Sequence, residues 1–401
     1  MWVKGFECFN SMESKEPTGK TFRYIDIKSI DNKKHIITEA KDINVSDAPS
    51  RASRGVGVGD TLFSMVRPYL ENIAYVDEKY ENCIASTGFF ICKPNRILYP
   101  KFLYYLMLSS YVIDGLNAFM KGDNSPSINN DNITTFLYPI PPFYEQQRII
   151  AVIEAAFALI DEIEFNKLSL TKFIKQTKSK VLNLAIRGKL VPQDPNDEPA
   201  SMLLERIKNE QKTKKNPCDS LHYPFEVPEG WVWCCIFDIG EVITGNTPSK
   251  ENKNYYGTDF PFYKPNDLDQ GLNMCVALDN LSAIGFEKAR QIPPFSILVC
   301  CIGSIGKVGV TDKICSCNQQ INAVIPYKST SFKYLYYYCI SDYFQDQLKI
   351  NSSATVVSIL NKSKFGQLTI PIPPLSEQHR IVTKIEQIFS QLDEIENSIK
   401  A

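Results

Sequence analysis

The stretch PIPPFYEQQRIIAVIEAAFALIDEIE occupies residues 139–164, and PIPPLSEQHRIVTKIEQIFSQLDEIE occupies residues 371–396. The two stretches share 15 identities in 26 positions without a gap, at a constant offset of 232 residues. The same offset aligns the run FLYY at 102–105 with YLYY at 334–337, so the repeat includes the segment before each stretch. The chain is therefore expected to contain two copies of one module, related as a pseudo-twofold internal repeat.

Each repeated stretch predicts an abrupt change from extended chain to helix. Alternate prolines hold residues 139–142 extended and disfavour helix immediately before them. Glu145 and Glu377 then fall in a first helical turn, where a carboxylate is favoured by the positive end of the helix dipole. Ser376 can cap the second helix.

Beyond both helix starts, apolar residues recur at alternating spacings of four and three. Of the eleven positions 149, 153, 156, 160, 163, 167, 170, 174, 177, 181 and 184, nine are apolar, the exceptions being Lys167 and Thr177. Such a pattern is typical of a coiled-coil seam, and two seams in one chain should pair. The predicted seam residues are Ile149, Ile153, Ile160, Ile163, Leu170, Ile174, Val181, Ile381, Ile385, Ile388, Leu392 and Ile395.

Charge patterning predicts how the two helices pair. A first helix over 145–187 would span roughly 64 Å and a second over 377–400 roughly 36 Å. The first is acidic in its N-terminal half and basic from Lys167 to Lys189, with no acidic residue between Glu164 and Asp194, whereas the second carries Glu386, Asp393, Glu394 and Glu396. The interpretation is an antiparallel coiled coil that lays the second helix on the basic half of the first and places the two modules at opposite ends.

Composition indicates an ordinary globular chain of two or three domains, with 401 residues, 44% apolar residues and 22% charged residues. No apolar run approaches the roughly 20 residues of a membrane span, and no signal peptide follows the first residues, so a cytoplasmic protein without membrane contact is expected. The predicted segments are a first domain over 1–142, a long helix over 143–190, a linker with a short helix over 191–223, a second domain over 224–374 and a second spacer helix over 375–401.

Both domains are expected to be mixed α+β, because short β-rich runs alternate with glycine, asparagine and proline turns. These runs are Arg23–Ile27, Thr61–Val66 and Gly88–Cys92 in the first domain and Val232–Ile236, Ser296–Ile302 and Asn322–Ile325 in the second. The predicted fold class is therefore α+β, with two similar domains separated by long helices.

Motifs that would carry catalysis are absent. GSIGKVG at 303–309 lacks the glycine spacing and the Ser or Thr of a phosphate loop, so it is interpreted as a tight turn between strands. PPF at 141–143 and at 293–295 lacks the polar residue with which amino-methyltransferases hold an exocyclic amine. The twelve cysteines form no CxxC pair and only three histidines are present, so no metal site is expected. We predict no catalytic residue and no cofactor bound by this chain.

Polar residues in loops are the candidates for contact with DNA. Arginine can read guanine and asparagine or glutamine can read adenine through paired hydrogen bonds, and lysine can bind phosphate. For each candidate the alternative is a solvated side chain or a turn hydrogen bond, and the net charge of -1 lacks the basic excess of many nucleic-acid proteins. The candidates are Arg51, Ser53, Arg54, Arg67, Lys250, Asn252, Lys264, Asn266, Lys307, Asn318, Gln319 and Gln320.

With the repeat and both seams in place, the chain resembles the specificity (S) subunit of type I restriction-modification systems. The resemblance covers nearly the whole chain. It is carried by both PIPP-x-x-EQ-x-R stretches and by the phrases GDTLFSMVRP at 59–68, AIRGKLVPQ at 185–193, PEGWVW at 228–233 and ITGNTPSK at 243–250. Two features depart from the family pattern. Trp2, the counterpart of the PEGW tryptophan, stands almost at the start of the sequence. The predicted second helix extends to Ala401 without reaching an AIRGKLVPQ phrase.

The resemblance implies that each half holds a target recognition domain that reads one part of a split double-stranded DNA sequence. It also implies that the helices form a spacer and dock two modification (methyltransferase) subunits, with motor-nuclease subunits able to join. S-adenosylmethionine and the catalytic residues would belong to the modification subunits. The rival hypothesis is a non-catalytic coiled-coil adaptor with two protein-binding domains, which the near-zero net charge keeps open.

Overall fold

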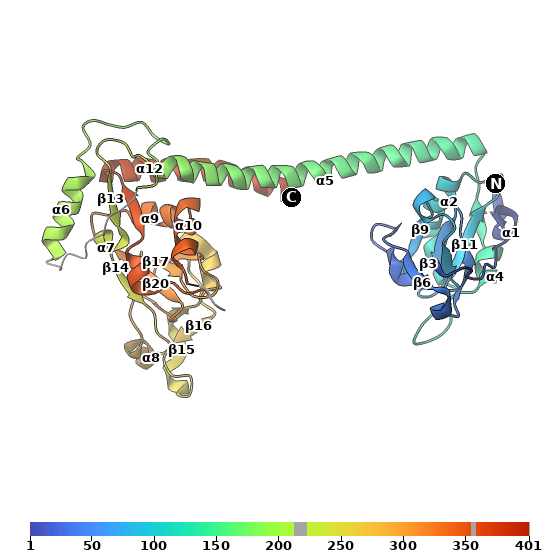
Figure 1. Cartoon of the computed structure of the whole chain (residues 1–401), viewed down its shortest axis with the longest axis horizontal. Coiled ribbons are helices and arrows are strands. Elements are labelled where there is room, and N and C mark those ends of the chain that lie inside the picture. Colours follow the sequence, from blue (N-terminus) through green and yellow to red (C-terminus); the bar gives the residue numbers. More distant parts are fainter. Residues whose placement is uncertain (212–222, 354–357, 401) are drawn as a thin grey trace. The chain divides into compact units, whose positions relative to one another are not determined.

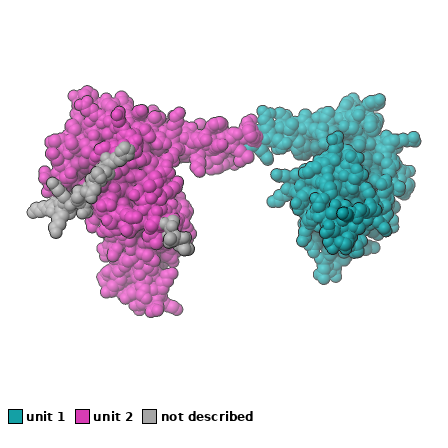
Figure 2. Space-filling model, viewed as in Figure 1, with its two compact units in different colours: residues 1–164 teal, residues 165–401 magenta. Residues whose placement is uncertain are grey.

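A computed structural model describes residues 1–211, 223–353 and 358–400. The chain divides into two compact units, Met1–Glu164 and Phe165–Ala401, which Figure 2 shows in different colours. Both units mix helices with short-stranded sheets, so the predicted α+β class is confirmed. Within the part of the chain that the structure describes, none of the helices has the length and apolarity that a membrane crossing requires.

Unit 1 is built on two four-stranded sheets. One has the order β6-β3-β10-β7 and the other the order β2-β11-β8-β9, while β1 pairs antiparallel with β12. Buried side chains of the second sheet, such as Phe63 and Phe90, share a core with residues of α2 and α3. The elements are β1 (Trp2–Lys4), α1 (Gly5–Cys8), β2 (Phe9–Asn10), β3 (Thr21–Ile25), β4 (Ile30–Asp31), β5 (Ile36–Ile37), β6 (Lys41–Asn44), β7 (Ala52–Gly55), β8 (Thr61–Ser64), β9 (Ile73–Tyr75), β10 (Ile84–Ser86), β11 (Phe89–Pro94), α2 (Pro100–Met107), α3 (Ser110–Asn117), α4 (Asn130–Thr135) and β12 (Leu137–Pro139).

Unit 2 contains a four-stranded sheet of order β14-β20-β17-β18, a three-stranded sheet of order β16-β15-β19 and the pair β13-β21. Helix α9 contacts α12 on one side and strands β17 and β18 on the other, so it lies between them (Figure 1). The elements are α6 (Ala200–Gln211), β13 (Val232–Cys235), α7 (Ile236–Ile239), β14 (Gly240–Thr244), β15 (Tyr256–Tyr263), β16 (Asp279–Leu281), α8 (Ala283–Lys288), β17 (Ile297–Cys300), β18 (Val308–Val310), β19 (Ser316–Cys317), β20 (Ile321–Pro326), α9 (Phe332–Cys339), α10 (Asp342–Asn351), α11 (Lys362–Gly366), β21 (Thr369–Ile372) and α12 (Leu375–Lys400).

The internal repeat is present in the fold at the offset seen in the sequence. Strand β11 corresponds to β20, α2 to α9, α4 to α11 and β12 to β21, each displaced by 232 residues. The helix caps repeat too: Ser109 and Ser341 accept hydrogen bonds from the third backbone N–H of α3 and α10. Asn129 and Asn361 do the same for α4 and α11. Local capping and tertiary packing thus specify the same substructure twice.

The turn from strand to helix is fixed in each unit by a buried glutamine of the EQ motif. Gln146 accepts from the backbone N–H of Tyr99 at 2.8 Å and donates to the carbonyls of Ile97 and Pro141, both at 2.9 Å. Its counterpart Gln378 accepts from the N–H of Ser331 at 2.9 Å and donates to a proline carbonyl at 3.0 Å. Each amide therefore ties the start of a long helix to the start of the helix that packs against it.

The two long helices are α5 (Phe143–Ile186) and α12. Within unit 2 the C-terminal part of α5 pairs antiparallel with α12, because Lys178 forms ion pairs with Asp393 and Glu396 while Val181 and Ile186 share a core with Ile381 and Ile385. The predicted antiparallel contact between the basic half of the first helix and the acidic second helix is confirmed in this stretch.

The predicted seam residues differ widely in burial. Ile174, Val181, Ile381 and Ile385 are buried in unit 2, and Ile388 packs partly buried against the same core. Ile149 and Ile153 pack instead on the core of unit 1. Ile160, Ile163 and Leu170 of α5 are 49%, 60% and 40% exposed, and Ile395 of α12 is 45% exposed. Leu392 of α12 is partly buried. A seam along the whole of α5 therefore stays a prediction.

Candidate nucleic-acid interface

Three loops of unit 2 gather at one end of its four-stranded sheet. In the sheet, Thr244 at the end of β14 pairs with Asn322, and Cys300 at the end of β17 pairs with Ile321, both near the start of β20. Strand order and direction therefore bring together residues 245–252, the β17–β18 hairpin loop at 301–307 and the turn at 318–320. This end lies opposite the end from which β20 continues into α9 (Figure 1).

The turn before β20 carries the predicted run Asn318, Gln319 and Gln320. Asn318 is buried, and its side chain donates to the side-chain oxygen of Gln320 at 2.8 Å. Gln320 donates in turn to the carbonyl of Ile302 on the hairpin loop at 3.3 Å. Gln319 is exposed and accepts from the hydroxyl of Thr247 at 2.6 Å. Asn318 and Gln320 thus hold the loops together, and Gln319 is the member of the run that faces solvent.

Two of the predicted lysines of unit 2, Lys264 and Lys307, lie in ion pairs. Lys307, on the hairpin loop, contacts Asp269 at 2.6 Å and Asn266 at 3.4 Å. Lys264 pairs with Asp279. The structure therefore brings the candidates Asn266 and Lys307 together, but acidic partners already compensate the charges of Lys264 and Lys307.

Two predicted residues and one unpredicted residue complete the loops of unit 2. Lys250 and Asn252 are exposed on the loop after β14, where the Asn252 side chain accepts from the N–H of Asn254 at 3.1 Å. Arg290 was not among the sequence candidates. It is exposed, and its guanidinium donates to the carbonyl of Thr244 at 2.6 Å, at the same end of the sheet. No local pattern marks Arg290; only the fold places it beside β14.

Unit 1 repeats this arrangement. Its hairpin β8–β9 corresponds to β17–β18, and Arg67 lies on the hairpin loop as Lys307 does in unit 2. Arg67 is exposed, has a left-handed backbone with φ of 49°, and donates from its guanidinium to the carbonyl of Asn124 at 2.9 Å. The turn before β11 contains Thr87, the counterpart of Gln319, whose N–H donates to the carbonyl of Arg51 at 2.8 Å. Arg51 is exposed.

The other two candidates of unit 1 lie on strand β7, which belongs to the sheet of order β6-β3-β10-β7. Ser53 accepts from the backbone N–H of Lys15 at 3.0 Å through its carbonyl. Arg54 lies opposite Ala85 of the neighbouring strand β10. The Nε atom of Arg54 is buried and has no hydrogen-bond partner within unit 1. Arg51 and Arg67 therefore share the loop end with the turn before β11, whereas Ser53 and Arg54 project from a neighbouring sheet.

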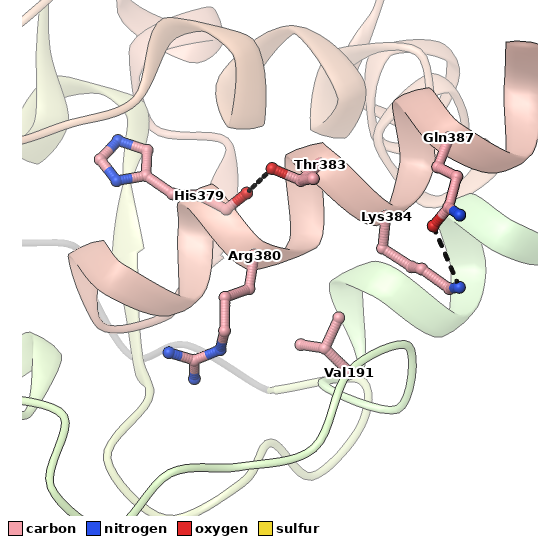
Figure 3. Close-up of a pocket in the computed structure, with 6 residues that line it drawn as sticks. All are labelled: Val191, His379, Arg380, Thr383, Lys384 and Gln387. Carbon is pink, nitrogen blue, oxygen red and sulfur yellow. Dashed lines mark hydrogen bonds between the residues drawn. The ribbon is translucent and has the colours of Figure 1, made fainter.

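A second polar region surrounds the start of α12, where the segment that follows α5 crosses the helix. The carboxylate of Glu377 accepts from the side-chain amide of Gln193 at 2.7 Å and from the indole N–H of Trp231 at 2.8 Å. Burial raises the pKa of Glu377, against the lowering effect of these two hydrogen bonds. Arg380 forms a two-pronged pair with Asp197, at 2.6 and 3.2 Å. Beside it, Val191 and the α12 residues drawn in Figure 3 line a shallow open pocket.

Comparison with known proteins relates the sequence and the fold of this chain to type I restriction enzyme specificity subunits. Residues 228–401 match the family model of the type I restriction modification DNA specificity domain. The chain is 29% identical, over 89% of its length and 85% of the relative, to the type I restriction enzyme HindI specificity subunit of Haemophilus influenzae. It is 26% identical to the HsdS subunit from Thermoanaerobacter tengcongensis, with a TM-score of 0.67 over 99% of this chain and 91% of that one. A chain from a solved structure concerning assembly and conformational transition of the type I R-M system matches with 25% identity and a TM-score of 0.65, over 100% of this chain and 92% of that one.

Proposed function

We propose that this chain, which is similar in sequence and fold to type I restriction-modification specificity subunits, recognises a bipartite target in double-stranded DNA. The observation that carries the proposal is the repeat of one loop arrangement in both units, with a polar hairpin loop and a polar turn at the same end of each central sheet. Each unit would read one half of the target. The chain itself would contribute recognition and no catalytic step.

Exposed side chains at these loop ends would make the contacts. Arg67 in unit 1 and Arg290 in unit 2 each use part of the guanidinium on a backbone carbonyl, which fixes the side chain and leaves other N–H groups to bind a base edge or a phosphate. Gln319 can read adenine in the major groove. Lys307 and Lys264 are held by Asp269 and Asp279, so they would contact phosphate only if the DNA displaces these acids.

The long helices would act as a spacer and as the docking site for partners. We infer that two modification subunits, which would bring S-adenosylmethionine and the methyl-transfer residues, bind along α5 and α12, and that motor-nuclease subunits join this complex. An insertion of one heptad into α5 should then lengthen the unread gap between the two half-sites. An unchanged gap in that variant would contradict the spacer role.

The experiment selects bound sequences from a randomised duplex library with the purified chain and its modification subunit, and then measures affinity for the selected DNA. Replacement of a base-reading side chain, as in Arg290→Ala or Arg67→Ala, should cost about 1–3 kcal/mol, or roughly 5- to 150-fold, and relax selection in one half-site only. Lys349→Ala removes an exposed lysine of α10 that is paired with Asp346 and serves as the control.

Two results would count against the proposal. Selection that enriches no sequence would favour the rival adaptor with two protein-binding domains. If neither Arg290→Ala nor Arg67→Ala changes the enriched sequence of either half-site, the sheet-end loops are not the reading surface.

A further inference from the structure

The turn between β4 and β5 of unit 1, at residues 31–36, has an equivalent in unit 2, the short helical segment Asp267–Asn273. The strands that lead into them, β3 and β15, pair in parallel with β10 and β19 at Ala85 and at Cys317, which are 232 residues apart. Each element also packs on the hairpin of its unit, because β5 contacts β9 and the segment Asp267–Asn273 contacts β18. The two elements therefore occupy the same place in the repeated fold.

An equivalent tyrosine hydroxyl lies against each element. Tyr104 of α2 donates its hydroxyl to the carbonyl of His35 at 3.0 Å. Its counterpart Tyr336 of α9 places its hydroxyl beside Gly271, where a Cβ atom would lie 2.9 Å from it. Both contacted residues have a left-handed backbone, with φ of 55° at His35 and 68° at Gly271. The repeat thus specifies the same bend in both units and leaves the side chains around it free to differ.

In unit 2 this element is acidic and compensates a charge of the hairpin loop. Asp267 and Asp269 are its only charged residues. Asp269 forms an ion pair with Lys307 of the hairpin loop at 2.6 Å. Asp267 is buried, and its carboxylate accepts from the backbone N–H groups of Lys264 and Leu278 at 2.7 and 3.2 Å. The segment therefore reduces the positive charge at the loop end of unit 2.

In unit 1 the same element is basic. Residues 31–36 carry Lys33 and Lys34 against one acid, Asp31, which gives a net charge of +1 with His35 neutral. Both lysines are exposed, and within residues 1–164, all of which the structure describes, neither ammonium group forms a hydrogen bond or an ion pair. Asp31 accepts instead from the backbone N–H groups of the two lysines, at 2.9 and 3.1 Å. The carboxylate thus fixes the turn, and two ammonium groups remain available to an anionic ligand.

The turn is attached to the hairpin loop that carries Arg67. Asn32 donates its side-chain amide to the carbonyl of Leu70 at 2.8 Å, and the ring of His35 forms a hydrogen bond with the carbonyl of Glu71 at 3.2 Å. Leu70 and Glu71 follow Arg67 in this loop, between β8 and β9. A duplex that lies against the loop would therefore bring its phosphate groups to the two lysines of the turn.

We propose that the turn at residues 31–36 of unit 1 is a binding site for the phosphate backbone of DNA, with Lys33 and Lys34 as its ligands, and that unit 2 lacks this site because aspartates take the place of the lysines. The inference rests on the proposed function. Phosphate contacts position a duplex and carry no sequence information, so the turn contributes affinity to the half-site of unit 1 and leaves the sequence read there unchanged.

The test uses the complex of the full chain with its modification subunit and measures affinity for the selected duplex and for an unrelated duplex over a series of salt concentrations. Each phosphate contact contributes about 0.9 to the slope of log K against log salt, which is about eightfold in affinity at 0.1 M relative to 1 M salt. Lys33→Ala and Lys34→Ala together should lower the slope by about 1.8 on both duplexes and weaken binding about 60-fold at 0.1 M salt. The selected sequence should stay the same. Lys33→Arg and Lys34→Arg together keep both charges and should keep the slope.

Lys20→Ala is the matched control, because Lys20 is an exposed lysine that precedes β3, at the end of this strand away from the turn. It should leave the slope unchanged. All three lysines are exposed, so their replacement should not prevent folding. The inference is overturned if the double alanine variant keeps the original slope on both duplexes, if Lys20→Ala lowers the slope equally, or if the arginine variant loses as much as the alanine variant. Failure of the proposed function is a different result, in which no sequence is selected, and the slope on the unrelated duplex then still tests the turn.

Discussion

Replacement of Gln146 by leucine tests whether the EQ motif is a structural link rather than a contact for DNA or a partner. Leucine has a similar volume but neither donates nor accepts a hydrogen bond. The change therefore leaves the N–H of Tyr99 and the carbonyls of Ile97 and Pro141 without their partner at a site where Gln146 is fully buried. Unsatisfied buried groups cost about 1–3 kcal/mol each, so a total loss of about 3–5 kcal/mol is expected after partial hydration.

Hydrogen exchange of the intact chain measures this loss locally, because a chain with two units does not have a single free energy of unfolding. Exchange protection in peptides that cover residues 97–108 should fall by about two to three and a half powers of ten. Peptides from unit 2 should keep their protection. Gln378→Leu should produce the reciprocal result, with loss around Ser331 and none in unit 1.

The control is Gln147→Leu, the exposed neighbour of Gln146, which should change protection by less than about 0.5 kcal/mol. The reasoning is refuted if Gln146→Leu stays within that same margin, or if both units lose protection equally.

Three further predictions concern stability. Burial raises the pKa of Asp60 to about 6 in the folded chain, above the ordinary value of 3.8. The contribution of Asp60 to the stability of unit 1 is therefore fully present below about pH 4 and is lost as the pH rises through 6. Asp60→Asn should flatten the pH dependence of hydrogen exchange in unit 1 and raise the stability of unit 1 at pH 8 by up to about 2–3 kcal/mol. Lys178→Glu should destabilise the helix pair in a salt-dependent way, and adding Asp393→Lys should restore at least half of the loss in a double-mutant cycle, unless the antiparallel register is wrong. Gly188 has φ of 64°, and a Cβ atom at this position would lie 2.3 Å from a side-chain carbon of Pro228. Gly188→Ala should therefore lower the melting temperature of unit 2. An unchanged melting temperature would argue against this packing.

The helices and the repeat could be predicted because both depend on local pattern. Prolines end the strand, the glutamate favours the first turn, and the apolar period selects which face is buried, as Ile381 and Ile385 show. The same period could not reveal which partner covers each turn. Ile153 packs on the domain core, and Ile160 lies exposed, although both belong to one unbroken pattern.

The candidate interface was less predictable, because its charges are compensated through tertiary contacts. The sequence makes Lys264 and Lys307 candidates for phosphate contact, yet each lies in an ion pair whose partner is brought close only by the fold. Arg290 was missed since its relevance depends on the fold, which brings the segment after α8 to the end of β14. The buried role of Gln146 was likewise invisible, because the sequence shows the motif but not the backbone groups that it binds.

The central claim is that the two units read two halves of one DNA target at a fixed separation. The most direct measurement is to co-express the chain with its modification subunit and to map methylated bases across the host genome by single-molecule sequencing. The account predicts methylation at a split motif with two specific parts and a constant unread gap. Methylation at a single contiguous motif, or at two parts whose separation varies, would contradict it.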